Sequence, residues 1–102
     1  NSNEISFKCV ERLIQILSPE NMEIGQPLYV NKLYTELDKV EGVQTVQTVK
    51  ITNLVDTNLG YSGNVYDVDL AYRHGIIYPS MDASIFEVKY PKTDIRVSVI
   101  DL

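Results

Sequence analysis

The sequence LYVNKLYTELDKVEGVQTVQTVKIT, residues 28–52, carries the clearest structural signal in this chain. Its first part repeats apolar side chains three or four positions apart, at Val30, Leu33, Leu37 and Val40. That spacing places them on one face of a helix. Gly42 favours the left-handed turn that commonly closes a helix. We therefore predict a helix over residues 30–41.

The second part of this stretch, residues 43–52, is dominated by valine, threonine and isoleucine and is typical of a β-strand. The valines recur every third position, whereas the side chains of a flat strand alternate with a period of two. We therefore predict a strand over residues 43–52 with a bulge or a strong twist near Val46.

Upstream, apolar residues at helical spacing predict a first helix over residues 3–17. Asn3 is a candidate N-cap, because its side-chain oxygen can accept from an amide of the first turn. The pair Ser18-Pro19 predicts the end of this helix, since proline disfavours a helical conformation in the residue before it. Residues 19–28 are polar, contain Pro19, Gly25 and Pro27, and predict a connecting loop.

Downstream, residues 53–64 predict a long loop rich in glycine, aspartate and asparagine. Apolar and polar residues alternate over 66–72, which favours a strand, with a short helix before Gly75 as the alternative. Residues 85–90 and 95–99 predict a hairpin around a turn at 91–94. In its first strand we expect three side chains to face inward, namely Phe86, Val88 and Tyr90.

This order of elements predicts an α+β fold in which two N-terminal helices pack on a small, mainly antiparallel sheet. The 102 residues are 44% hydrophobic, which suits one core and one domain spanning residues 1–102. The first residues, Asn1-Ser2-Asn3, contain no initiator methionine. We therefore expect this domain to be a fragment of a larger protein.

The formal net charge of −5 argues against a nucleic-acid partner, because binding a phosphate backbone requires an excess of basic residues. The apolar runs are only a few residues long, so we expect neither a transmembrane segment nor a membrane partner. The single cysteine, Cys9, cannot form an internal disulfide, and we expect synthesis inside the cell. We interpret Cys9 as a packing residue on the first helix.

The titratable residues do not form a recognisable catalytic or metal-binding motif, and we predict no enzymatic activity, no cofactor and no metal. Asp67 and Asp69 fail the spacing of a calcium loop, because Ala71 and Tyr72 occupy positions that require a ligand and a glycine. His74 is the only histidine and we interpret it as a turn residue beside Gly75.

Tyrosine is the more informative residue type. Five of the seven tyrosines lie between residues 61 and 90: Tyr61, Tyr66, Tyr72, Tyr78 and Tyr90. Tyrosine is enriched at protein interfaces, because it combines a large rigid ring with a hydroxyl group that can find a partner. These rings therefore form either an interaction surface or part of the sheet's own core.

The string SMDASIFEVKYPKTDI at residues 80–95 resembles the C-terminal region of baseplate wedge proteins from contractile-tailed phages, in the wider baseplate-J-like group. Residues 28–46 resemble the same group, in which a helix leads through a Gly-Val junction into a strand. Gly42, Val43 and Val46 occupy that junction here. The group often has a small residue two positions after Asp-Ile, where this chain has Val97.

The resemblance implies a structural component of the virion tail baseplate, synthesised in the bacterial host cytoplasm and without catalytic residues. It implies that the domain is the C-terminal fragment of a larger baseplate protein. It also implies contacts with other wedge proteins and a homo-oligomer, with a dimer favoured. No small-molecule substrate is expected. The candidate interface residues are Tyr72, Tyr78, Ile85 and Arg96.

Two alternatives come from other classes of protein. A small-ligand-sensing regulatory domain would enclose a pocket between loop 53–64 and the tyrosines. An enzyme would use two of four carboxylates as an acid–base pair, drawn from Asp67, Asp69, Asp82 and Glu87.

Overall fold

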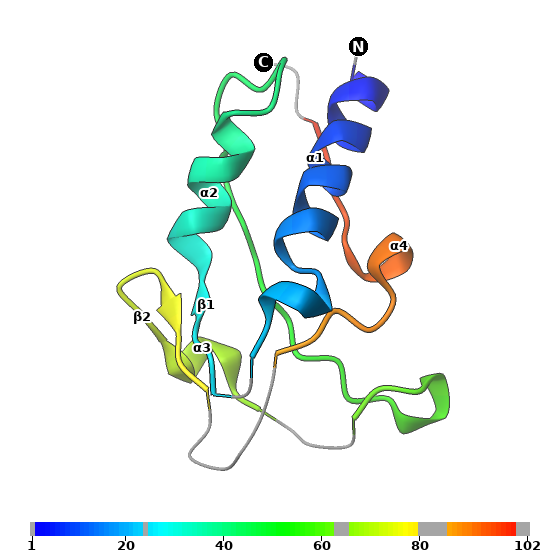
Figure 1. Cartoon of the computed structure of the whole chain (residues 1–102), viewed down its shortest axis with the longest axis vertical. Coiled ribbons are helices and arrows are strands. Elements are labelled where there is room, and N and C mark those ends of the chain that lie inside the picture. The colour runs from blue at the N-terminus through cyan, green and yellow to red at the C-terminus, as the bar shows by residue number, and fades with distance from the viewer. Residues whose placement is uncertain (1, 24, 63–65, 80–85, 100–102) are drawn as a thin grey trace.

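The computed structural model describes residues 2–23, 25–62, 66–79 and 86–99, and it has the predicted α+β architecture (Figure 1). Helix α1 spans Ser2–Ile16 and is followed by the 3₁₀ turn η1, Pro19–Asn21. The predicted end at Ser18-Pro19 is confirmed. Asn3 is the second residue of the helix, so the prediction that it caps the helix is wrong.

Strand β1, Leu28–Tyr29, leads directly into helix α2, Val30–Asp38. The helix is confirmed but ends before residue 41. Gly42 instead occupies a separate turn in which the Val43 amide donates to the Val40 carbonyl at 3.1 Å. Its φ is 95°, and a Cβ at this position would lie 2.8 Å from Cγ1 of Ile5, so both conformation and space require glycine here.

The described residues form one three-stranded antiparallel sheet in the order β1-β3-β2. Strand β2 is Tyr72–Arg73 and strand β3 is Ile76–Ile77. Before them lies the short helix α3, Val68–Ala71, whose first turn is capped by the Asp67 side chain accepting from the Leu70 amide at 3.0 Å. The preferred strand over residues 66–72 is therefore wrong up to Ala71, and the alternative of a short helix is right.

Residues 43–52 contain no regular strand, which corrects the prediction. Val43, Val46 and Val49 are half-buried, and the two residues between each pair are exposed. A buried side chain at every third residue cannot be sustained by a flat strand with a period of two. It matches the period of a polyproline II conformation, which has three residues per turn and no internal hydrogen bonds.

The prediction of a C-terminal hairpin is also wrong. The predicted turn is present as α4, Pro91–Asp94, but the flanking residues 86–90 and 95–99 do not form a ladder with each other. Phe86 and Val88 are half-buried as expected, whereas Tyr90 is 41% exposed. The Tyr90 amide donates to the Asp94 carboxylate at 2.9 Å, and the Asp94 amide donates to the Tyr90 carbonyl at 2.7 Å, so these two residues close a helical turn.

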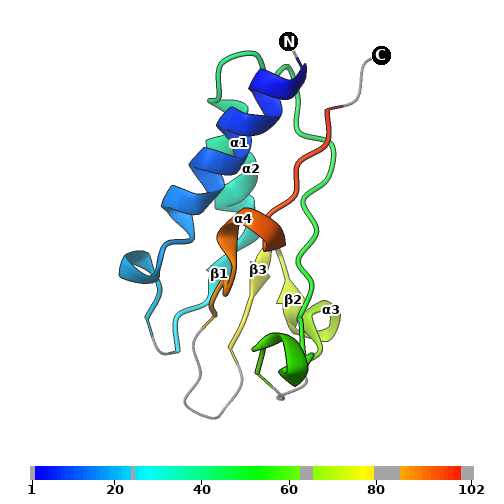
Figure 2. The same ribbon diagram turned by 90° about the vertical axis from the view of Figure 1, so that its right-hand side faces the viewer.

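Two hydrophobic clusters form the core. One joins α1 to α2 through Cys9, Leu13, Leu33 and Leu37. The other attaches the sheet below α2 through Met22, Leu28, Val30 and Ile77. Both views show α1 and α2 side by side with the sheet near the lower end of α2 (Figures 1 and 2). The packing of the N-terminal helices on the sheet is thus confirmed.

Candidate interaction surface

The three short strands place one row of side chains inward and the next row outward. Leu28 pairs with Ile77, and both are buried in the second cluster. The neighbouring row pairs Tyr29 with Ile76, and Ile76 with Arg73. Because successive side chains alternate across a sheet, this second row faces away from the core.

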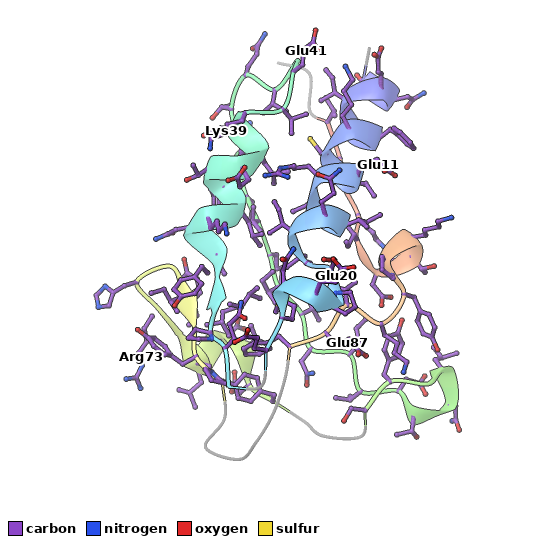
Figure 3. All side chains as sticks on the ribbon, viewed as in Figure 1. Glu11, Glu20, Lys39, Glu41, Arg73 and Glu87 are labelled. Atoms are coloured by element: carbon purple, nitrogen blue, oxygen red, sulfur yellow. The ribbon has the colours of Figure 1, made fainter. Side chains whose placement is uncertain are left out.

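Tyr78 follows Ile77 and therefore belongs to the outward side with Ile76. It is 45% exposed, and Tyr29 is 47% exposed. The outward side thus presents two tyrosine rings beside an isoleucine, and Arg73 projects from β2 away from the helices (Figure 3). We call Tyr29, Arg73, Ile76 and Tyr78 the outer sheet face.

The turn between β2 and β3 is hydrogen-bonded to the start of α2, and this contact fixes the position of the outer sheet face. His74 and Gly75 have φ values of 53° and 80°, the pair of positive values that a two-residue type I′ turn requires. The Asn31 amide donates to the Gly75 carbonyl at 3.1 Å, and the Asn31 side chain donates to the His74 carbonyl at 3.3 Å. The interpretation of His74 as a turn residue is confirmed.

The backbone at Tyr78 is held from two sides. Its amide donates to the Ala71 carbonyl at 3.3 Å, and its carbonyl accepts from the Tyr66 hydroxyl. Tyr66 in turn packs against Phe86, with ring centroids 5.9 Å apart. The exposed Tyr78 ring is therefore carried on a fixed backbone, which lowers the entropy that a partner would have to remove on binding.

A second group of aromatic residues joins loop 53–62 to α4. The Tyr61 and Tyr90 rings meet edge to face, with centroids 5.4 Å apart. The Tyr61 hydroxyl donates to the Asp94 carboxylate at 2.6 Å, and the Tyr90 hydroxyl donates to the Leu59 carbonyl at 2.8 Å. The hydrogen bond to Asp94 raises the pKa of Tyr61 to about 12. The hydroxyl groups of Tyr61 and Tyr90 thus connect loop 53–62 to α4 within the chain.

The structure describes three of the four predicted interface residues, namely Tyr72, Tyr78 and Arg96. Tyr72 and Tyr78 lie on the same sheet, and both are exposed. By register, however, Tyr72 shares the row of Leu28 and Ile77, so it lies at the edge of the inward side. Arg96 is exposed beyond α4, where its side chain donates to the Thr93 carbonyl at 3.4 Å. Ile85 lies outside the described residues.

Some exposed apolar residues were not predicted. Leu70 is 76% exposed, although alternation placed it inward, because residues 68–71 are helical. Phe7 is 64% exposed on α1. In the sequence Phe7 lies at the flank of the helical apolar face formed by Val10, Leu13, Ile14 and Leu17, and this position is the signal that could have identified its exposure.

Two open hollows follow the groove between α1 and α2. One, of about 300 Å³, is lined by Phe7, Glu11 and Val40 among others, and the other, of about 330 Å³, by Met22, Leu28 and Tyr29 among others. Arg12 and Glu36 separate them with an ion pair of 2.7 Å. The described part of the loop where the ligand-sensing alternative placed its pocket, residues 53–62, contributes no residue to the lining of either hollow.

The hydrogen bond from Arg12 and the positive charge of Lys39 hold the pKa of Glu36 below its usual value, against the opposing effect of desolvation. Burial raises the pKa of Cys9, in line with its interpretation as a packing residue.

The carboxylates of the enzyme alternative do not show a pairing in the described residues. Asp67 caps α3, Glu87 is exposed, and Asp82 lies outside the described residues. Among the residues that the structure describes, no three potential metal ligands come together.

Comparison with protein-family models, with curated proteins and with solved structures finds no match to this chain. No helix within the described ranges is both long and apolar enough to cross a membrane.

Proposed function

We propose that this chain is an assembly domain of a contractile-tail baseplate, in which it contacts wedge proteins and further copies of itself. The observation that carries the proposal is the sequence at residues 80–95, read together with the helix and Gly-Val junction at residues 28–46. In this role the domain belongs to the virion tail, and its work is to bind other proteins rather than to transform a substrate.

The outer sheet face supports this proposal. Interfaces are enriched in tyrosine and arginine, and Tyr29, Tyr78 and Arg73 supply both residue types around Ile76. Rigid aromatic rings on a fixed backbone lose little freedom when a partner covers them. A wedge component that docks here would bury rings that are about half exposed in the isolated chain.

The test is to locate the chain in the particle. Antibodies against this domain should label the baseplate end of purified contractile tails of the parent phage in electron micrographs, and mass spectrometry of the same tails should recover its peptides. Tails purified from a phage lacking the corresponding gene segment provide the control. Intact tails that contain neither the label nor the peptides would refute the proposal.

A further inference from the structure

Residues 95–99 have the burial pattern of a β-strand, although no strand among the described residues pairs with them. Ile95, Val97 and Val99 are half-buried, while Arg96 and Ser98 are exposed. Ile95 has extended backbone angles, with φ −95° and ψ 119°, and the chain continues from it as an elongated trace along α1 (Figure 2). Ile95 and Val97 pack against the cluster between α1 and α2. One face of this segment is therefore already covered.

The backbone of this segment is available for pairing. Within the described ranges, the amide and carbonyl groups of residues 96–99 make no hydrogen bond to another residue. Figure 1 shows the segment on the flank of α1, with no other ribbon beyond it above α4. A row of unpaired donors and acceptors on a strand-like segment is a template for strand addition.

Residues 43–49 also pack against the α1–α2 cluster, but they suit a ladder less well. Their half-buried residues recur every third position, so a regular partner strand could not match their two faces. Residues 95–99 alternate with a period of two, as a ladder requires. The edge formed by residues 95–99 is thus the better site for an added strand.

We propose that residues 95–99 pair antiparallel with the same residues of a second copy of this chain, with Val97 opposite Val97. This inference rests on the proposed assembly role and specifies the surface through which copies meet. The pairing places Ile95 opposite Val99 and Arg96 opposite Ser98. Apolar residues then face apolar residues, as a twofold-symmetric contact requires of a self-complementary surface.

Charge, side-chain direction and overlap together select this register among the symmetric ones, since centring the pair on Ser98 would pair only residues 97–99 with one another. Shifting the axis of pairing to Arg96 would place two arginines directly opposite each other, which destabilises a strand pair. Placing the axis between two residues would set an inward side chain opposite an outward one. Centring the pair on Val97 avoids both penalties.

The experiment changes the charge at Ser98, which is exposed and lies opposite Arg96 of the second copy in this register. S98E creates two opposite-charge pairs per dimer and should tighten the dimer by about 2- to 30-fold, and S98R should weaken it to a similar extent. The dissociation constant is measured by sedimentation velocity over a concentration series. T48E and T48R, at an exposed position of the other extended segment, are the matched controls and should leave the constant unchanged.

Three outcomes would overturn the proposal. The first is that the wild-type chain is monomeric at every concentration. The second is that the chain forms a dimer whose dissociation constant does not respond to the charge at residue 98. The third is that the amides of residues 96–99 gain hydrogen-exchange protection only inside tails, through another protein. Circular dichroism confirms that each variant is folded. Labelled tails combined with any of these results would refute strand pairing and leave the assembly role standing, so the two failures are distinguishable.

Discussion

Gly75, like Gly42, has a conformation and surroundings that are both restrictive. Its φ of 80° disfavours any residue with a Cβ, and a Cβ there would overlap the Asn31 side chain. We expect Gly75→Ala to lower the free energy of unfolding by about 2–3 kcal/mol, because it adds backbone strain and displaces the Asn31 contacts to the turn. Urea unfolding followed by circular dichroism measures the change.

Gly25 provides the matched control. It has a similar φ of 76°, but a Cβ there would meet no atom within 4 Å. Gly25→Ala should therefore cost only about 1 kcal/mol, the strain of the backbone alone. Equal losses for the two variants would show that Asn31 does not hold the turn.

Tyr61 should titrate later than an ordinary tyrosine, because its hydroxyl donates to the Asp94 carboxylate and the pKa is raised to about 12. The neutral phenol is the favoured form in the fold. Its contribution to stability is therefore fully present below the ordinary value of 10.0 and is lost as the pH rises through the raised pKa.

Ultraviolet titration of the phenolate should resolve this late tyrosine, and Asp94→Asn should shift its pKa back toward 10.0. Asp69→Asn, on α3, removes the same charge elsewhere and should leave the late titration unchanged. A late tyrosine that persists in Asp94→Asn would contradict this origin of the shift.

At the scale of elements, the Arg12–Glu36 ion pair is the charged contact that crosses between α1 and α2. It lowers the pKa of Glu36, so the associated stability is present above the ordinary value of 4.5 and is lost as the pH falls through the lowered pKa. We expect Arg12→Met, which keeps an apolar stem, to raise the pKa of Glu36 toward 4.5 in an NMR titration.

Lys39→Met is the comparison for this variant. Lys39 lies 3.6 Å from Glu36 on the same helix, and its side chain is 68% exposed. Its removal should move the pKa of Glu36 less than the removal of Arg12. If Lys39→Met moved the pKa of Glu36 more than Arg12→Met does, the lowered pKa would arise from charges within α2 and would not report the contact of α2 with α1.

The sequence predicts some elements better than others for a physical reason. Helices α1 and α2 have apolar faces several turns long, so periodicity alone locates them. The strands have two residues each, too few for any period to be read. The Asp67 cap determines the conformation of residues 66–71, and the hydrogen bonds of Asp94 determine that of residues 90–94. These side-chain interactions override the local alternation of apolar and polar residues.

The candidate surface was predicted only in part. Tyrosine enrichment directs attention to Tyr78, which is exposed, but a surface also depends on strand register, which brings Tyr29 beside Ile76 from a distant part of the sequence. The sequence alone does not tell which tyrosines are available to a partner. Tyr61 differs from Tyr78 because its hydroxyl is hydrogen-bonded to the Asp94 carboxylate.

At the scale of the whole molecule, the two hydrophobic clusters share three partly buried residues: Leu17, Val49 and Ile51. Val49 also donates its amide to the Tyr34 hydroxyl at 2.8 Å. We expect Val49→Ala to cost about 1 kcal/mol and to speed amide exchange in both α1 and the sheet, because it loosens the connection between the clusters.

Val43→Ala is the control, since Val43 packs against the α1–α2 cluster and is not among the residues of the sheet cluster. It should speed exchange more in the helices than in the sheet. If Val49→Ala affected the helices alone, the two clusters would be independent in stability.

The register of the sheet also leads to a prediction about the order in which the molecule folds. Leu28 pairs with Ile77, about fifty positions later, whereas α1 and α2 are joined by a short connection. Closing a long loop costs more chain entropy than closing a short one, so the helices meet at a smaller cost. Rate measurements should place Leu37 contacts in the folding transition state and Ile77 contacts after it. We therefore expect the outer sheet face to form after the helical scaffold that holds it.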